Sequence, residues 1–289
     1  MVAKSACFAG LVTLSVVIFW APLTMLLRFS LEHVLYSHIV LVPLITGCLL
    51  VLEREAIFSR VEARRWMGFC LLTTGAVLYP LGKRVVTAQS PNDQLSVAMF
   101  AVVIIWIGIF TASYGHHALR KGLFPLLFLF LMVPIPDILL NWITAVLVAG
   151  SAEVSHVLLE LTNVPFVRNG FVFSFPGFAI EIAQECSGIR SSLALLVTSL
   201  LAGHLFLRSF WARVALVAAT LPMLVVKNGI RIVSLSLLSV YVDPRFLTGS
   251  LHQQGGFVFF MIALLILVPI LRLLRTLEAK PRTAVPVQE

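Results

Sequence analysis

The segment LSVAMFAVVIIWIGIFTASY, from Leu95 to Tyr114, contains no charged side chain. A helix that crosses a bilayer needs about 20 mostly apolar residues, so this segment predicts a membrane span. The whole chain has the same character: of its 289 residues, 60% are hydrophobic and 12% are charged, and the mean hydropathy is +1.01. Soluble domains average about 45–50% apolar and about 25% charged residues. The composition therefore argues against a soluble enzyme, a disordered protein and a nucleic-acid-binding domain.

Further apolar runs extend this prediction along the chain. The runs expected to span are Ala6–Leu27, Val34–Leu52, Trp66–Gly82, Leu95–Tyr114, Leu123–Leu140, Ile189–Leu207, Val214–Val240 and Gly256–Leu274. The first is too long for a signal-peptide core and no small-residue cleavage site follows it, so we expect it to be retained. The sequence thus predicts an all-α polytopic membrane protein with about eight transmembrane helices. We expect a single integral-membrane domain over residues 1–279 and a short disordered cytoplasmic tail over 280–289.

The segment Leu140–Leu161 is apolar but carries several polar side chains, so it could span the membrane or lie on its surface. If it lies on the surface, one side of the membrane collects roughly 13 of the 21 basic residues, and the richer side should be cytoplasmic. If it spans, this bias almost disappears. We therefore expect an interfacial helix on the outer face of the membrane, with both chain termini inside.

The segment Asn163–Gln184 follows this helix and has the pattern of a β-hairpin. Asn169-Gly170 stands between stretches of β-branched and aromatic residues, which is typical of a hairpin turn. Because a two-stranded hairpin is not stable alone, we expect it to pack on the outer ends of the helices and to shape a substrate groove.

The four cysteines, Cys7, Cys48, Cys70 and Cys186, show no CxxC spacing, so we expect neither a disulfide framework nor a zinc site. Cys186 differs from the others because it lies among polar residues, ECSGIRSS (Glu185–Ser192), at the outer start of the sixth run. If a helix begins near Cys186, its N–H groups and the positive end of its dipole favour the thiolate. Arg190 would then lie one turn later on the same face.

A second polar cluster, KNGIR (Lys227–Arg231), comes late in the seventh run. That run would form a helix of about 40 Å, longer than the roughly 30 Å apolar slab, so Arg231 can reach the outer interface. Asn228 and Arg231 are three residues apart and share a helix face. Arg231 either anchors the helix at the interface or supplies a fixed cation for a substrate carboxylate or a developing oxyanion.

A third cluster, LHQQGG (Leu251–Gly256), precedes the last run on the same predicted side. The imidazole of His252 has the chemistry of a base for a thiol proton and of an acid for a leaving amine. Cys186, Arg231 and His252 together would provide a nucleophile, an anion stabiliser and a proton carrier. Such chemistry requires no metal and no organic cofactor.

Three other interpretations of these clusters remain open. Ser187 could be the nucleophile of a serine peptidase with His252. A non-enzymatic transporter or anionic-lipid-binding protein could use Arg190, Lys227 and Arg231 to hold an anion. The chain could also be an inactive scaffold that retains the motifs.

The clusters resemble the motifs of the exosortase/archaeosortase family of membrane transpeptidases, over roughly residues 134–274. The matching stretches are Cys186-Ser-Gly-Ile-Arg190-Ser, Pro222 followed by Asn228-x-x-Arg231, His252 with Gly256, Pro134-Ile-Pro136, and Val164-Pro-Phe-x-Arg168-x-Gly170. Lys227 departs from the pattern, because many members carry alanine before the asparagine.

This resemblance implies that Cys186 attacks a peptide bond in the C-terminal sorting signal of a secreted protein and forms a thioester. Arg231 and His252 correspond to the family's other two catalytic positions. Arg190, Asn228 and Gly188 are expected to support the site, and Arg190 is the alternative to Arg231 as the main oxyanion partner. The signals carry a short motif (Pro-Glu-Pro in the best-known class), a transmembrane helix and a basic end.

The resemblance also bears on partners and location. Histidine at position 252 is similar to the bacterial branch, which is linked in many members to exopolysaccharide production. We therefore expect secreted proteins, membrane lipid and an unknown acceptor nucleophile as partners, no nucleic acid, and a site that faces the periplasm.

Overall fold

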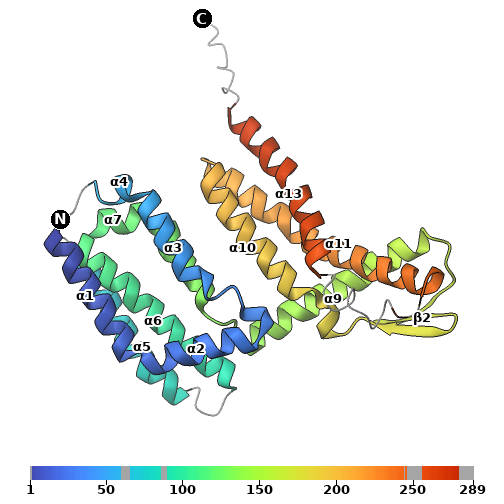
Figure 1. Cartoon of the computed structure of the whole chain (residues 1–289), viewed down its shortest axis with the longest axis horizontal. Coiled ribbons are helices and arrows are strands. Elements are labelled where there is room, and N and C mark those ends of the chain that lie inside the picture. The colour runs from blue at the N-terminus through green and yellow to red at the C-terminus, as the bar shows by residue number, and fades with distance from the viewer. Residues whose placement is uncertain (1, 60–65, 86–89, 244, 246–255, 280–289) are drawn as a thin grey trace, which may run out of the picture. The chain divides into compact units, whose positions relative to one another are not determined.

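The computed structural model describes residues 2–59, 66–85, 90–243, 245 and 256–279, and the described part is mainly helical (Figure 1). The chain forms two compact units, Met1–Leu140 and Asn141–Glu289. The second unit begins close to the start of the motif-bearing part, residues 134–274. The single domain over residues 1–279 stays a prediction, and the predicted tail at 280–289 lies outside the described residues.

Among the helices of the N-terminal unit that are long and apolar enough to cross a membrane, α6 (Pro91–Tyr114) is the most buried. Ser90 caps its start, since the Ser90 hydroxyl accepts the Asp93 N–H. Helix α6 contains the whole predicted span Leu95–Tyr114, so that prediction is confirmed as a helix. The other elements of this unit are α1 (Val2–Ile18), α2 (Trp20–Glu32), η1 (Val34–Tyr36), α3 (Leu41–Leu52), α4 (Arg54–Ile57), α5 (Trp66–Val85), α7 (His116–Lys121), α8 (Leu123–Phe128) and η2 (Leu129–Met132).

The first predicted span, Ala6–Leu27, is not one straight helix. Helix α1 ends at Ile18 and α2 begins at Trp20, and the two axes differ by 75°. Pro22 explains the break, because proline lacks an N–H and its ring clashes with the carbonyl four residues earlier, which here belongs to Ile18.

The predicted span Leu123–Leu140 is also wrong as a continuous helix. Helical structure ends at Met132, and Val133 is extended (φ −78°, ψ 122°) because a residue before proline disfavours the helical conformation. The segment nevertheless follows α6, since Phe130 packs on Phe100. At its end, the Asp137 N–H donates to Asp93 Oδ1 at the start of α6 (2.8 Å). Two short helical segments and a stretch of extended chain thus take the place of the single helix expected over Leu123–Leu140.

Helix α9 (Asp137–Glu160) contains nearly all of Leu140–Leu161 in one continuous helix. Its buried residues recur every three or four positions and form one stripe, namely Thr144, Leu147, Val148, Ser151, Ala152, Ser155 and Leu159. The helix is long and apolar enough to cross a membrane. Its length therefore does not separate a span from an interfacial helix, and the interfacial placement stays a prediction.

Helix α11 (Phe210–Tyr241) is the longest element of the C-terminal unit. Its 32 residues correspond to about 48 Å, more than the roughly 30 Å apolar slab. One apolar cluster, which includes Leu195, Leu216 and Leu267, joins its first half to α10 (Ile189–Phe206) and α13 (Gly256–Ala279). Figure 1 shows α11 continuing beyond these helices to the β-sheet. The predicted runs that end at Leu207, Val240 and Leu274 are confirmed as α10, α11 and α13.

The predicted hairpin is part of a three-stranded antiparallel sheet with the order β1 (Val167–Asn169), β2 (Val172–Phe175) and β3 (Phe178–Glu181). Gly170 forms the first turn with φ 63°, one residue later than the Asn-Gly pair suggests. The second turn is Pro176-Gly177, with Gly177 at φ 96°. Proline followed by glycine with positive φ is the pattern of a type II turn, and it adds the third strand.

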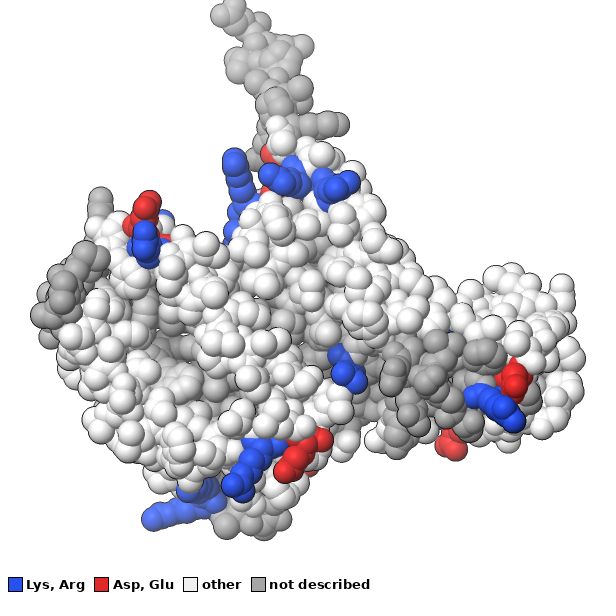
Figure 2. Space-filling view, viewed as in Figure 1, with Lys and Arg blue, Asp and Glu red and all other residues white. Residues whose placement is uncertain are grey.

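Among the described residues, six helices are long and apolar enough to cross a membrane, or seven if α1 and α2 form one span. Helix α5, which we expect to span, is not among them, so the count of eight is not confirmed. The all-α polytopic class is confirmed. On the face in Figure 2, charged side chains lie in separate groups with wide uncharged surfaces between them. Many large apolar side chains are exposed, as lipid-facing helices require.

Candidate active site

Cys186 lies in a short turn before α10 rather than inside the helix. The turn η3 (Gln184–Ser187) has 3-10 geometry, Gly188 follows in the left-handed conformation (φ 66°, ψ 17°), and α10 begins at Ile189. The expectation that a helix begins near Cys186 is therefore wrong by three residues. The structure describes the backbone of Cys186 but not its side chain, so the predicted effect of the helix dipole on the thiol stays a prediction.

Arg190 was expected one helical turn after Cys186 on the same face. Because Gly188 interrupts the helix between them, the two residues do not have this relation, and that prediction is wrong. Arg190 is exposed in the first turn of α10. It belongs to the next element after the Cys186 turn and not to a shared helix face.

Gly188 packs directly against Asn228 of α11. A side-chain carbon added to Gly188 would lie 2.5 Å from Asn228 Oδ1 and 2.9 Å from its Cγ. The positive φ also penalises any residue other than glycine. Position 188 thus requires glycine for two independent reasons. This contact brings the Cys186 turn and the polar cluster of α11 together, although they are about 40 residues apart in sequence.

Asn228 is fully buried and also contacts α9. Its Nδ2 donates to Ser151 Oγ (2.9 Å), and Ser151 is fully buried as well. Gly229, the next residue, lies where a side-chain carbon would be 2.5 Å from Val154 Cγ1. Asn228 therefore joins three elements: α9, α11 and the Cys186 turn.

Sequence reasoning missed Ser151. The available signal was the small residues Ser151 and Ser155, four apart in an apolar helix, because this spacing is typical of helices in close contact. Ser155 is fully buried, and its Oγ has no hydrogen-bond partner among the described residues. The pattern could have predicted a close helix contact, but not its partner.

Arg231 lies one turn after Asn228 on α11 and is half-buried. Ile232 and Val233, which follow it, pack in the apolar cluster that contains Phe173 and Phe175 of the sheet. The sheet thus covers α11 directly after Arg231. Of the three predicted catalytic residues, the structure describes Arg231 completely, the backbone of Cys186, and none of His252, which lies outside the described residues.

The sheet is tied to α9 by Arg168. Its Nη2 and Nη1 donate to Oε1 and Oε2 of Glu153 at 2.5 and 3.1 Å, and its Nε donates to the Gly170 carbonyl (3.0 Å). The hydrogen bond to Glu153 raises the pKa of the Arg168 guanidinium above its ordinary value. Two residues, Ile182 and Ala183, connect β3 to the Cys186 turn, and Ile182 is buried in the sheet cluster.

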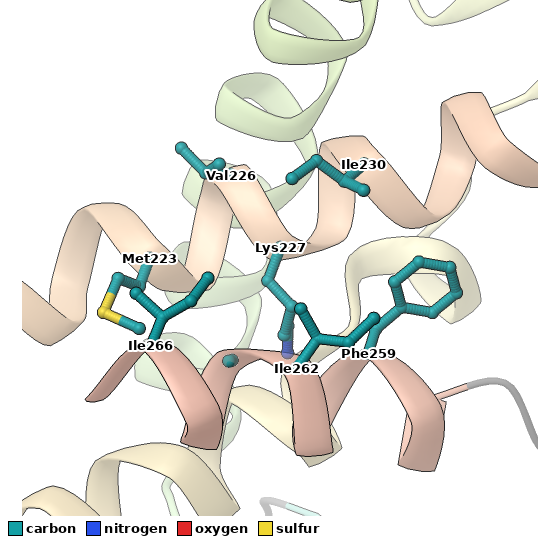
Figure 3. Close-up of a pocket in the computed structure, with 8 residues that line it drawn as sticks. Met223, Val226, Lys227, Ile230, Phe259, Ile262 and Ile266 are labelled. Atoms are coloured by element: carbon teal, nitrogen blue, oxygen red, sulfur yellow. The ribbon is translucent and has the colours of Figure 1, made fainter. Parts of the chain in front are cut away.

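Lys227 is buried, with 6% of its surface exposed. Its Nζ donates to Ser191 Oγ of α10 at 2.5 Å and lies 3.4 Å from Ser192 Oγ. The side chain also lines a cavity of about 50 Å³ between α11 and α13 (Figure 3). The other residues that line this cavity are apolar: Met223, Val226, Ile230, Phe259, Ile262, Ala263 and Ile266.

Ser187, the alternative nucleophile, is fully buried, and its Oγ accepts the Ile189 N–H at 3.4 Å. Its position inside the turn therefore favours a structural role. Cys7, Cys48 and Cys70 are free, and all three are exposed on their helices.

Comparison with known proteins gives one match. The family model described as "transmembrane exosortase" matches residues 8–269. No curated protein and no solved structure matches the chain. The family match extends well beyond the motif-bearing part and includes Cys186, Arg231 and His252. With its apolar helices, the chain is a multi-pass membrane protein that belongs to the transmembrane exosortase family.

Proposed function

We propose that this protein is a membrane cysteine transpeptidase or protease that cleaves C-terminal sorting signals of secreted proteins. The observation that carries the proposal is the contact between Gly188 and Asn228, because it holds the Cys186 turn against the helix that carries Arg231. A nucleophile and a cation on separate elements can act on one carbonyl only if such a contact brings their elements together. Membership of the exosortase family supports the same chemistry.

In the proposed reaction, the Cys186 thiolate attacks the carbonyl carbon of the scissile peptide bond, and a C–S bond forms. Arg231 stabilises the negative charge that develops on the carbonyl oxygen. His252 then protonates the amine as the C–N bond breaks, which leaves a thioester on Cys186. An acceptor nucleophile then attacks the thioester carbonyl and gives its proton to His252, and the C–S bond breaks, which releases the Cys186 thiolate. Water makes the reaction a hydrolysis, whereas an amine or hydroxyl makes it a transfer.

The membrane scaffold would deliver the substrate. The signal's own transmembrane helix diffuses in the bilayer and packs against the enzyme, so the scissile bond arrives at the outer interface. Ten residues of α11 follow Arg231, and Tyr241 is the last of them. They add about 15 Å of helix beyond the guanidinium. This length is consistent with a site at the outer face of the inner membrane, as the basic residues predict.

The test is cleavage of a co-expressed secreted protein that ends in a Pro-Glu-Pro motif, an apolar helix and basic residues. Cys186→Ala should abolish cleavage while the protein remains in the membrane at normal abundance. Cys48→Ala is the matched control, because Cys48 is a free, exposed cysteine on α3, and it should cleave normally. Normal cleavage by Cys186→Ala would exclude this nucleophile.

A second measurement separates an enzyme from a transporter or an anionic-lipid-binding protein. With substrate present, wild type should accumulate a substrate adduct on Cys186 that hydroxylamine releases, as expected for a thioester. A transporter forms no such adduct. When the reaction runs without hydroxylamine, the group attached to the cleaved protein identifies whether water, a lipid or a glycan is the acceptor.

A further inference from the structure

Lys227 is a cation in an environment that does not favour one. It is 6% exposed, it lines a cavity together with Phe259, Ile262 and Ile266 of α13, and Figure 3 shows the side chain extending from α11 toward that helix. Among the described residues, no carboxylate forms an ion pair with it. Burying an ammonium without a carboxylate costs free energy, and a methionine would fill the same space without this cost.

The ammonium is connected to the Cys186 turn through one hydroxyl. Lys227 Nζ donates to Ser191 Oγ (2.5 Å), and Ser191 Oγ in turn donates to the carbonyl oxygen of Gly188 (3.1 Å). A hydroxyl that accepts a proton from a cation is polarised and becomes a stronger donor to the next acceptor. The charge on α11 therefore strengthens a hydrogen bond to the backbone two residues after Cys186.

The same glycine is held from a second direction. Asn228, the neighbour of Lys227 in sequence, packs its Oδ1 against the Gly188 backbone. Gly188 is consequently fixed by two consecutive residues of α11: directly by Asn228, and through Ser191 by Lys227. The Gly188 carbonyl also accepts the Ser192 N–H, which is the first hydrogen bond of α10 (2.9 Å).

We propose that Lys227 is a positioning residue for the Cys186 turn, acting through the Ser191 hydroxyl on the Gly188 carbonyl. This inference rests on the proposed function, since it concerns the placement of that nucleophile. Lys227 need not touch the substrate. Burying its charge is unfavourable, and in exchange the hydrogen bonds of the ammonium fix the orientation of the turn.

The experiment measures how fast iodoacetamide alkylates Cys186 in purified protein in which Cys7, Cys48 and Cys70 are serine. Lys227→Met and Ser191→Ala should each slow alkylation by about tenfold, because the rate depends on the thiolate fraction and accessibility of Cys186, and both change when its turn loses a fixed orientation. The double variant should be no slower than the slower single variant, since both changes break one chain of hydrogen bonds. Ser191→Thr, which keeps the hydroxyl, should retain most of the wild-type rate.

Thermal unfolding in detergent separates positioning from general support of the fold. Lys227→Met should unfold at the same or a higher temperature than the parent while it reacts more slowly. Lys121→Met, at an exposed lysine of α7, is the matched control and should change neither property. Unchanged alkylation in Lys227→Met, multiplicative effects in the double variant, or slower alkylation only together with a lower unfolding temperature would each overturn the inference.

The outcome is distinguishable from failure of the proposed function. If Cys186→Ala still cleaves substrate, the nucleophile assignment fails whatever Lys227 does. If Cys186→Ala is inactive and Lys227→Met alkylates at the parent rate, only the positioning role fails.

Discussion

Two buried asparagines, one in each unit, differ in what they hold together. In the N-terminal unit, Asn92 donates from Nδ2 to the Ile135 carbonyl (2.8 Å) and to Asp137 Oδ1 (2.6 Å), which joins the start of α6 to the start of α9. In the C-terminal unit, Asn228 joins α9, α11 and the Cys186 turn. Burial and hydrogen bonding are similar at both. Only Asn228 has the Cys186 turn as a neighbour, which indicates a role beyond stability. Substitution of Asn228 should therefore affect activity, whereas substitution of Asn92 should not.

The largest effect is expected for Gly188→Ala. The added carbon would meet Asn228 Oδ1 at 2.5 Å, and the left-handed backbone adds a penalty of about 1–2 kcal/mol. We expect cleavage of a sorting-signal substrate to fall by about 100-fold or more, measured per folded molecule.

Gly170→Ala is the control for Gly188→Ala. Gly170 has nearly the same φ, 63°, but a side-chain carbon there would meet no atom within 4 Å. It should lose about 1–2 kcal/mol of stability and keep its activity. Equal loss of activity in both variants would show that strain, rather than the contact with Asn228, explains the result.

A direct comparison of the asparagines comes next in size. Asn228→Ala and Asn92→Ala should each lower the free energy of unfolding by about 1–3 kcal/mol, because each leaves buried polar groups unsatisfied. Asn228→Ala should also reduce cleavage per folded molecule by about tenfold or more. Asn92→Ala should leave it unchanged. Comparable activity of the two variants would show that Asn228 has no role in cleavage that Asn92 lacks.

Ser151→Ala should have a smaller effect. It removes the acceptor of Asn228 Nδ2 (2.9 Å) but leaves the amide in contact with Gly188. We expect a stability loss of about 1–2 kcal/mol and a decrease in cleavage of less than about fivefold. A decrease as large as that of Asn228→Ala would mean that the link to α9, and not the contact with Gly188, holds the turn.

The smallest effect is expected for Arg168→Ala, measured by thermal or chemical unfolding. Its partner Glu153 is 68% exposed, and ion pairs with exposed groups contribute little to stability because water screens the charges. The loss should shrink further at high salt, because exposed charges are screened. A loss that persists at high salt would mean that Arg168 contributes through its packing on the Phe173 ring.

Some of the structural features behind these comparisons could be predicted from the sequence, and others could not. The apolar runs predicted α6, α10, α11 and α13 because a bilayer selects on length and hydropathy alone. The helix breaks at Phe19 and Val133 could also have been predicted from the sequence, because Pro22 and Pro134 disfavour helical structure in the residues just before them. Pro176-Gly177 likewise carried a local signal for the third strand.

For the candidate site, the sequence motifs indicate residue types but not their geometry, and the catalytic roles stay predictions. Gly188, Asn228 and Arg231 follow from the motifs, but the start of α10 at Ile189 does not. That start requires the left-handed Gly188, which is accommodated only by the absence of a side chain next to Asn228. The partnerships with Ser151 and Ser191 arise from packing between separate helices, so no local pattern could indicate them.

The Cys186 turn is anchored on both sides. Ile182 is fixed in the core beneath the sheet and Gly188 is fixed on α11, so only Ala183–Ser187 separates two anchored points. An inserted residue would add up to about 3.3–3.6 Å of chain between these two points and would change the path of the turn. If the proposed function holds, the sheet and α11 together set the position of the nucleophile's backbone, because Ile182 and Ala183 are the only residues between β3 and the Cys186 turn.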